Sequence, residues 1–243
     1  MHNARGHGSE RLDDPHLVAR EYRTIDRLAM RRLDRTGWLR GEGEPWLLAL
    51  RAIAETRPSR VLDAGCGNGD FAELITAPNV VCVDSSPAAV AAARSRGLSA
   101  QVADIRELPF ADGSFDVVVC NWVLYHARDR ARAIGELARV LRHSGRLVGC
   151  YNGQSHLAEL WAAVGRSWPE DGFTCETAAR ELRRSFTSVE CRDAQTEVLW
   201  TTRDALQSYL DAYREILGPV AAPAGPYPFR AARRNCVLVA MRA

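Results

Sequence analysis

The feature that most constrains the fold is a series of short apolar segments, each separated from the next by a turn or a stretch with helical spacing. A short apolar run bounded by turn residues is typical of a strand buried on both faces. Strands of this kind that alternate with helices form a parallel sheet covered on both sides, so the sequence predicts an α/β fold. The five segments are 61–64, 80–84, 100–104, 115–120 and 145–151.

The pattern changes after Tyr151, where longer polar stretches separate the apolar segments. Two further strands are predicted at 189–200 and 235–241, which brings the expected number to seven. The residues before the first strand show amphipathic helical spacing from 15 to 56 and predict a helical cap. Helices are predicted at 129–142, 156–164, 175–186 and 202–217, and Ser86 and Pro87 are typical of a helix start.

Charge excludes several classes of function. The 243 residues carry a formal net charge of +2, which is too small to predict binding to nucleic acid or to a membrane surface. All basic residues are arginine, so a Schiff-base lysine or a nucleotide-binding loop lysine is excluded. The pair Arg233 and Arg234 is predicted to lie on a solvated face, with binding of a phosphate-bearing acceptor as the alternative.

The seven cysteines are odd in number and form no CxxC pair. A disulfide framework and a zinc site are therefore not expected, and no metal is predicted. The N-terminal residues lack the apolar segment of a secretion signal, and no apolar run reaches the length of about 20 residues that a membrane span needs. We expect a cytoplasmic protein with no membrane partner.

A glycine-rich turn, VLDAGCGNGDFAEL at 61–74, is the most informative segment. A strand ends near Asp63, glycines follow at 65, 67 and 69, and a helix is expected next. Glycines allow a sharp turn and close approach of a ligand to the backbone. A carboxylate this close would repel a pyrophosphate, so Asp63 favours a cofactor that has no phosphate and carries a cationic group.

Three further polar residues stand where strands of the predicted sheet end. Asp84 lies nineteen residues after Gly65, where a carboxylate can accept hydrogen bonds from ribose hydroxyls. Asp104 ends the third strand and could accept from an adenine amine, and Asn121 follows the fourth. Because open α/β sheets bind ligands at the carboxyl ends of their strands, these side chains predict one common site.

These motifs, together with Leu108–Asp116 and Arg139–Leu141, resemble the class I S-adenosylmethionine-dependent methyltransferases, and the type 11 small-molecule subgroup most of all. The resemblance implies a Rossmann-like, seven-stranded, mostly parallel sheet with helices on both faces and an antiparallel last strand. It implies S-adenosyl-L-methionine as cofactor. The residues implied to bind it are Asp63, Gly65, Cys66, Gly67, Asp84, Ser85, Asp104, Ile105 and Asn121.

The resemblance covers about residues 58 to 151 and leaves the acceptor open. It implies a flexible N-terminus and helical lid at 1–56, and a methyltransferase domain at 57–243 with acceptor-pocket insertions around 152–187 and 203–230. We expect methyl transfer to an oxygen or nitrogen of a small molecule, with natural-product biosynthesis as the favoured setting, by a monomer or homodimer. His126 is the candidate base, because an ordinary pKa near 6.5 suits proton removal. An RNA or protein methyltransferase and a catalytically silent cofactor-binding protein are the alternatives.

Overall fold

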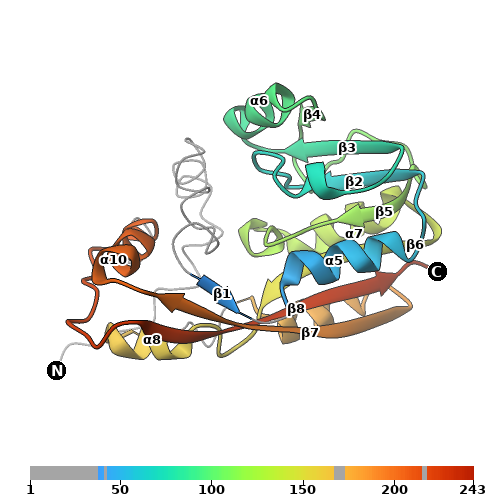
Figure 1. Ribbon diagram of the computed structural model, residues 1–243. Coiled ribbons are helices and arrows are strands. Elements are labelled where there is room, and N and C mark those ends of the chain that lie inside the picture. Colours follow the sequence, from blue (N-terminus) through green and yellow to red (C-terminus); the bar gives the residue numbers. More distant parts are fainter. Residues whose placement is uncertain (1–37, 41–42, 167–172, 215–217) are drawn as a thin grey trace.

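The computed structural model describes residues 38–40, 43–166, 173–214 and 218–243, and its centre is one eight-stranded sheet (Figure 1). The strand order is β1-β7-β8-β6-β5-β2-β3-β4. Seven of these strands are the predicted ones. The eighth, β1, pairs antiparallel with β7 at the far edge and spans Trp38–Arg40.

One half of the sheet is parallel and lies in the first part of the chain. Apolar residues of neighbouring strands pair with one another, such as Leu62 with Val81 and Leu62 with Val118. All five residues of β5 are buried, as expected for a strand covered on both faces. The strands are β2 (Arg60–Ala64), β3 (Asn79–Asp84), β4 (Ser99–Val102) and β5 (Phe115–Val119), and β6 (Leu141–Asn152) continues them in parallel.

The other half is antiparallel and is joined through β6 to the parallel half. The strand β8 (Phe229–Met241) inserts between β6 and β7 (Ser188–Trp200) and runs antiparallel to both. The predicted antiparallel last strand is thereby confirmed. It begins at Phe229, six residues earlier than predicted, because the arginine-rich run 230–234 pairs with β7 along its full length.

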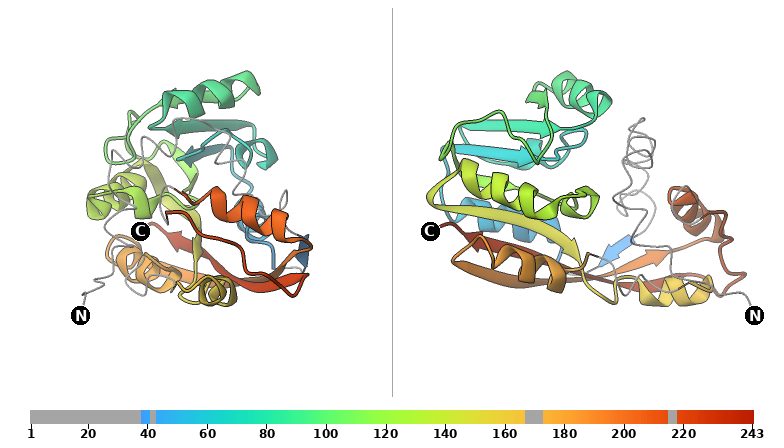
Figure 2. Two further views of the ribbon diagram at one scale, coloured as in Figure 1. Left: turned by 90° about the vertical axis from the view of Figure 1, so that its left-hand side faces the viewer. Right: turned by 180° about the vertical axis from the view of Figure 1, so that it is seen from behind.

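Helices cover both faces of the sheet, as Figure 2 shows from two further directions. The helices α7 (Arg130–Val140) and α9 (Cys175–Leu182) share one hydrophobic core with the sheet. The helix α5 (Pro45–Ala54) packs on the opposite face, against Val148, Val237 and Val239. The helix α6 (Pro87–Ser95) packs on β3 and β4, with Ser86 as its N-cap and Pro87 as its first residue, as predicted.

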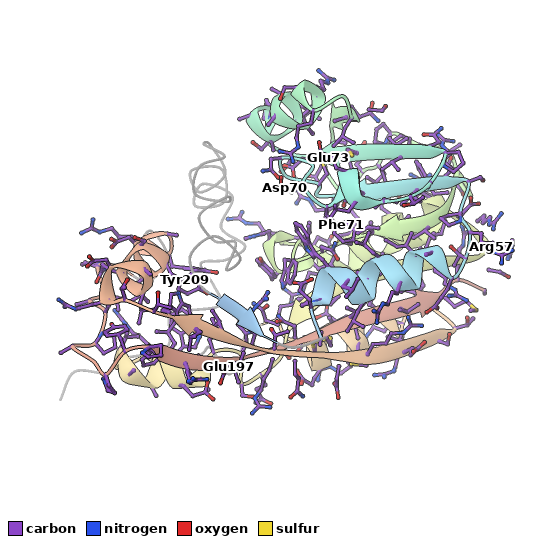
Figure 3. All side chains as sticks on the ribbon, in the orientation of Figure 1. Arg57, Asp70, Phe71, Glu73, Glu197 and Tyr209 are labelled. Atoms are coloured by element: carbon purple, nitrogen blue, oxygen red, sulfur yellow. A yellow bond between two sulfur atoms is a disulfide. The ribbon has the colours of Figure 1, made fainter. Side chains whose placement is uncertain are left out.

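The outer part of the β7–β8 hairpin carries its own small core. It is built by α8 (Ala158–Ala163) and α10 (Arg203–Asp211) around Trp200, which is fully buried. Tyr209 of α10 lies over this end of the hairpin (Figure 3), with its ring centroid 5.1 Å from that of Trp200. Thr202 caps α10, as predicted, by accepting a hydrogen bond from the backbone N–H of Ala205.

Three predictions of local structure are wrong. The glycine turn is followed by a single 3-10 turn at Ala72–Leu74 instead of a helix, because Pro78 leaves too few residues for one. Residues 38–40 form β1 instead of a helix, since β7 offers them an open edge. The remaining predicted cap, at 1–37 and 41–42, lies outside the described residues.

The third correction concerns the cysteines. The structure joins Cys175 at the start of α9 to Cys236 on β8 by a disulfide, with 6.1 Å between the two Cα atoms. The odd number of cysteines and their spacing predict no disulfide framework, and for this pair the prediction is wrong. The pairing is tertiary, 61 residues apart in the chain, and no local motif marks it. Within the described ranges, no helix is both long and apolar enough to cross a membrane.

Candidate active site

The glycine turn connects β2 to the 3-10 turn and is fixed by hydrogen bonds to the next strand. The backbone N–H groups of Gly65 and Cys66 both donate to the carbonyl of Val83, at 2.8 and 3.0 Å. Gly65 has φ of +84°, a conformation that costs a residue with a side chain about 1–2 kcal/mol. A Cβ atom at this position would also overlap the side chain of Val123, so the turn requires glycine here.

Asp63 lies beneath this turn as a buried carboxylate. Its residue is 2% exposed, and its Oδ2 atom has no hydrogen-bond partner. Burial, with a smaller contribution from the charge of Asp84, raises the pKa of Asp63 to about 7. A buried carboxylate without a partner is costly, so the position is suited to a cationic or hydrogen-bond-donating ligand group.

Asp84 at the end of β3 holds the turn from the other side. Its Oδ2 accepts from the backbone N–H of Gly67 at 2.9 Å, and its Oδ1 accepts from that of Ser86 at 2.8 Å. Burial raises the pKa of Asp84, while backbone donors at Ser86, Gly67 and Ser85 act to lower it. Each oxygen retains a lone pair for a further donor, as two vicinal hydroxyls would require.

Asp104 follows β4 and is anchored to the tip of β3, since the N–H of neighbouring Ala103 donates to the carbonyl of Asp84 at 3.1 Å. Both Asp104 oxygens accept from Arg106, and this guanidinium lowers the pKa of the carboxyl. Ile105 is half-buried against the α7 side of the core. The structure thus brings the three predicted carboxylates to one edge of the sheet. At this edge the carboxylate of Asp104 is already paired with Arg106.

Asn121 and His126 complete the predicted set after β5. The Oδ1 atom of Asn121 accepts from the N–H of Cys150 at 2.9 Å, whereas its buried Nδ2 has no partner. His126 ends a 3-10 turn, Leu124–His126, and its ring centroid lies 4.2 Å from that of Tyr125. His156, by contrast, is buried at the start of α8, with Nδ1 bonded to the carbonyl of Arg234, and burial lowers its pKa to about 3.

The residues at this edge fit S-adenosyl-L-methionine. Asp63 offers an unpartnered oxygen to a cationic group and Asn121 an unpartnered N–H to a carboxylate. Gly65 lets the backbone turn with a positive φ beside these atoms, because Val123 fills the space that a Cβ would need. Among the described residues, no group of three histidine, cysteine or acidic side chains is arranged to hold a metal ion.

Sequence reasoning missed two parts of the surroundings. Phe71, which follows the glycine turn, packs edge-on against Trp46 of α5 with ring centroids 5.3 Å apart (Figure 3). A hydrogen-bond chain also leaves the site toward β8. Trp122 Nε1 donates to Asn152 Oδ1 at 2.9 Å, and Asn235 Nδ2 donates to the same oxygen at 2.8 Å. The only sequence signal for this chain is that polar residues occupy one face of apolar strands.

Comparison with known proteins agrees with this geometry. Residues 62–149 match the family described as "Methyltransferase domain". A probable S-adenosylmethionine-dependent methyltransferase of Mycobacterium tuberculosis is 49% identical over 92 residues, which cover 36% of this chain and 34% of that protein. A malonyl-[acyl-carrier protein] O-methyltransferase of Methylococcus capsulatus is 34% identical over 168 residues, covering 63% and 60%.

Solved structures share the fold at low identity. The YcgJ protein of Bacillus subtilis superposes with a TM-score of 0.57 at 16% identity and covers 82% of this chain and 97% of its own. Residues 62–149 thus match a methyltransferase domain of the type 11 kind, and the Mycobacterium relative that they resemble is named as dependent on S-adenosylmethionine. The matched segments span about a third to three fifths of the curated relatives named here.

Proposed function

We propose that this protein transfers a methyl group from S-adenosyl-L-methionine to an oxygen or nitrogen atom of a small molecule. The observation that carries the proposal is the buried carboxylate of Asp63, whose Oδ2 has no hydrogen-bond partner, beneath a glycine turn held by Asp84. The relative from Methylococcus, which acts on an oxygen of a malonyl group, supports an oxygen acceptor. The low net charge favours a small acceptor over RNA.

The cofactor would supply an electrophilic methyl group on a sulfonium. The work of this chain's residues is then to bind and align. In the proposal, Asp63, Asn121 and the backbone of Gly65, Cys66 and Gly67 hold the amino-acid end. Asp84 and Ser85 hold the ribose, and Asp104 and Ile105 hold the adenine. Alignment of a nucleophile can supply up to about 7–11 kcal/mol of the barrier, so positioning alone can account for much of the rate.

His126 is proposed as the group that takes the proton of a hydroxyl or ammonium acceptor. It follows Asn121 by five residues and lies in the 3-10 turn Leu124–His126, which comes after β5 in the chain. The segments 152–187 and 203–230 are proposed to build the acceptor pocket. In their described parts, α8 and α10 cover the outer part of the β7–β8 hairpin, whereas α9 packs with α7 on the sheet.

Titration calorimetry with S-adenosylhomocysteine tests the cofactor site. We expect micromolar binding and a loss of at least tenfold in Asp84→Ala, because two charge-assisted hydrogen bonds to the turn are removed with the carboxylate. Asp193→Ala, which removes an exposed carboxylate on β7, is the matched control and should bind normally. Binding that is absent, or that is indifferent to Asp84, would refute the proposal.

The role of His126 is tested separately by turnover. In His126→Ala we expect kcat for a hydroxyl acceptor to fall by about 10²-fold or more, while affinity for S-adenosylhomocysteine changes little, since general-base catalysis contributes about 10²–10⁴-fold. His143→Ala, at an exposed position of β6, controls for loss of a histidine. An unchanged kcat would show that His126 is not the base.

A further inference from the structure

One arginine of the arginine-rich run on β8 is buried. Arg233 is 9% exposed, whereas Arg234 beside it points to the opposite face of the strand and is exposed. The predicted solvated face therefore holds for Arg234 and is wrong for Arg233. Strand alternation places Arg233 on the same face as Val237 and Val239, which α5 covers.

The Arg233 guanidinium lacks the hydrogen bonds that burial demands. Its Nε and Nη1 atoms are buried and have no hydrogen-bond partner. Its nearest charged neighbour is Glu44, with Nη1 and Oε1 3.8 Å apart, which is too long for a hydrogen bond. Glu44 is already engaged, because its Oε2 accepts from the N–H of Trp46 at the start of α5. A buried charge left in this state is expensive unless a ligand completes it.

Two neighbours of Arg233 on the same face also have buried polar atoms without a hydrogen-bond partner. Thr196 lies directly opposite on β7 and is 7% exposed, and its hydroxyl has no partner. Asn235, two residues along β8 and 4% exposed, leaves its Oδ1 without a partner. The residues that flank them, Ala194 and Ala231, are small and apolar. The face thus presents unpaired polar atoms in an apolar surround, between the parts of the hairpin that α5 and α10 cover.

This group is connected to the candidate active site. Asn235 donates to Asn152, which also accepts from Trp122, the residue after Asn121. Burial is the main cause of the raised pKa of the Cys150 thiol. The charge of Arg233 acts to lower this pKa and the charge of Asp63 acts to raise it, so both charges lie near Cys150. Hydrogen bonds thus connect Asn235, two residues from Arg233, to Trp122, which follows Asn121.

We propose that Arg233, with Thr196 and Asn235, forms a subsite that binds the carboxylate of an apolar methyl acceptor. The inference rests on the proposed function and names its substrate class. A carboxylate fits better than a phosphate, because the nearby Glu44 carboxylate repels a doubly charged anion more strongly than a singly charged one. Arg233 is here a specificity-determining residue and takes no part in methyl transfer.

The test uses the full chain, with and without S-adenosylhomocysteine, and probes matched in shape. Calorimetry compares octanoate with octanamide and phenylacetate with phenylacetamide, and adds phenyl phosphate. We expect each acid to bind at least tenfold more tightly than its amide and more tightly than phenyl phosphate. In Arg233→Met this preference should disappear, while affinity for S-adenosylhomocysteine stays within twofold. Arg234→Met, on the exposed face of the same strand, should retain the preference.

Melting temperature separates a binding role from a structural one. If Arg233 is kept for a ligand, Arg233→Met without acid should melt at the same temperature as the wild type or a few degrees higher, because a buried guanidinium whose Nε and Nη1 lack hydrogen bonds has been removed. A lower melting temperature with unchanged acid binding would overturn the proposal, as would equal affinity of wild type for acids and amides. Tighter binding of phenyl phosphate would also reject a carboxylate subsite. Failure of the cofactor site would appear separately, as absent binding of S-adenosylhomocysteine.

Discussion

The two halves of the sheet differ in how their buried polar groups are hydrogen-bonded. In the parallel half, Asp84 accepts from the backbone N–H groups of Gly67 and Ser86, and Asp63 Oδ2 and Asn121 Nδ2 are among the buried polar atoms without a partner. In the antiparallel half, Arg233, Thr196 and Asn235 stand on a strand face among alanines with atoms unpaired. In the first half the polar atoms lie beside a glycine turn at the carboxyl ends of parallel strands, whereas in the second they lie along the pleated face of a hairpin.

The strongest test of this contrast is the pH dependence that Asp63 imposes. Its pKa of about 7 in the folded protein lies above the ordinary 3.8, so between about pH 4 and 7 the folded protein keeps a proton that the unfolded chain has lost. Stability from this group is complete below pH 4 and falls as the pH rises to 7, by on the order of 4 kcal/mol.

Asp63→Asn should remove this fall, so that the variant gains stability relative to wild type as the pH rises from 4 to 7. Urea unfolding at a series of pH values measures the difference. Comparison with wild type cancels the opposite contributions of Asp104, Asp116 and Glu136, whose pKa values are lowered. Parallel curves for the two proteins would show that Asp63 is not held in an unpaired state.

The disulfide tests whether the antiparallel half is tied together covalently. Cys175–Cys236 closes a loop of 61 residues between α9 and β8, and its loss in Cys175→Ser should lower the free energy of unfolding by about 3 kcal/mol. Adding reductant to the wild type should have the same effect. Cys191→Ser, at an exposed free cysteine, is the control. Because both cysteines are buried, the protein is alkylated after denaturation without reductant, and labelling of both Cys175 and Cys236 would show that the bond is absent.

The smallest effect expected concerns the glycine turn. Gly65→Ala should cost about 2 kcal/mol of stability and abolish detectable cofactor binding, because the new Cβ is strained and overlaps Val123. Gly97→Ala is a matched control, since Gly97 has the same φ of +84° and open space around it. Thermal unfolding of both variants isolates the overlap. Equal losses would mean that the turn tolerates a side chain where the ligand is expected to approach.

The two halves of the sheet also differ in how much of their structure the sequence predicts. The parallel half was predictable because its strands are continuously apolar, its glycines mark the turn, and Ser86 and Pro87 mark the next helix. In the antiparallel half, Arg233 looked like one of a solvent-exposed pair, since its burial depends on the register with Thr196. The β1 strand, the Cys175–Cys236 bond and the early start of β8 depend likewise on contacts between distant segments, which leave no local pattern.

The place of β8 in the sheet has a consequence for how the protein is made. It follows β6 and β7 in the chain, yet it lies between them in the sheet and pairs with both. The nascent chain can assemble β2 to β6 while β7 still has no neighbour on that side. During synthesis both strands expose unpaired edges that attract other chains, so a ribosome that stalls within residues 229–241 would release a cofactor-binding half attached to an aggregation-prone one.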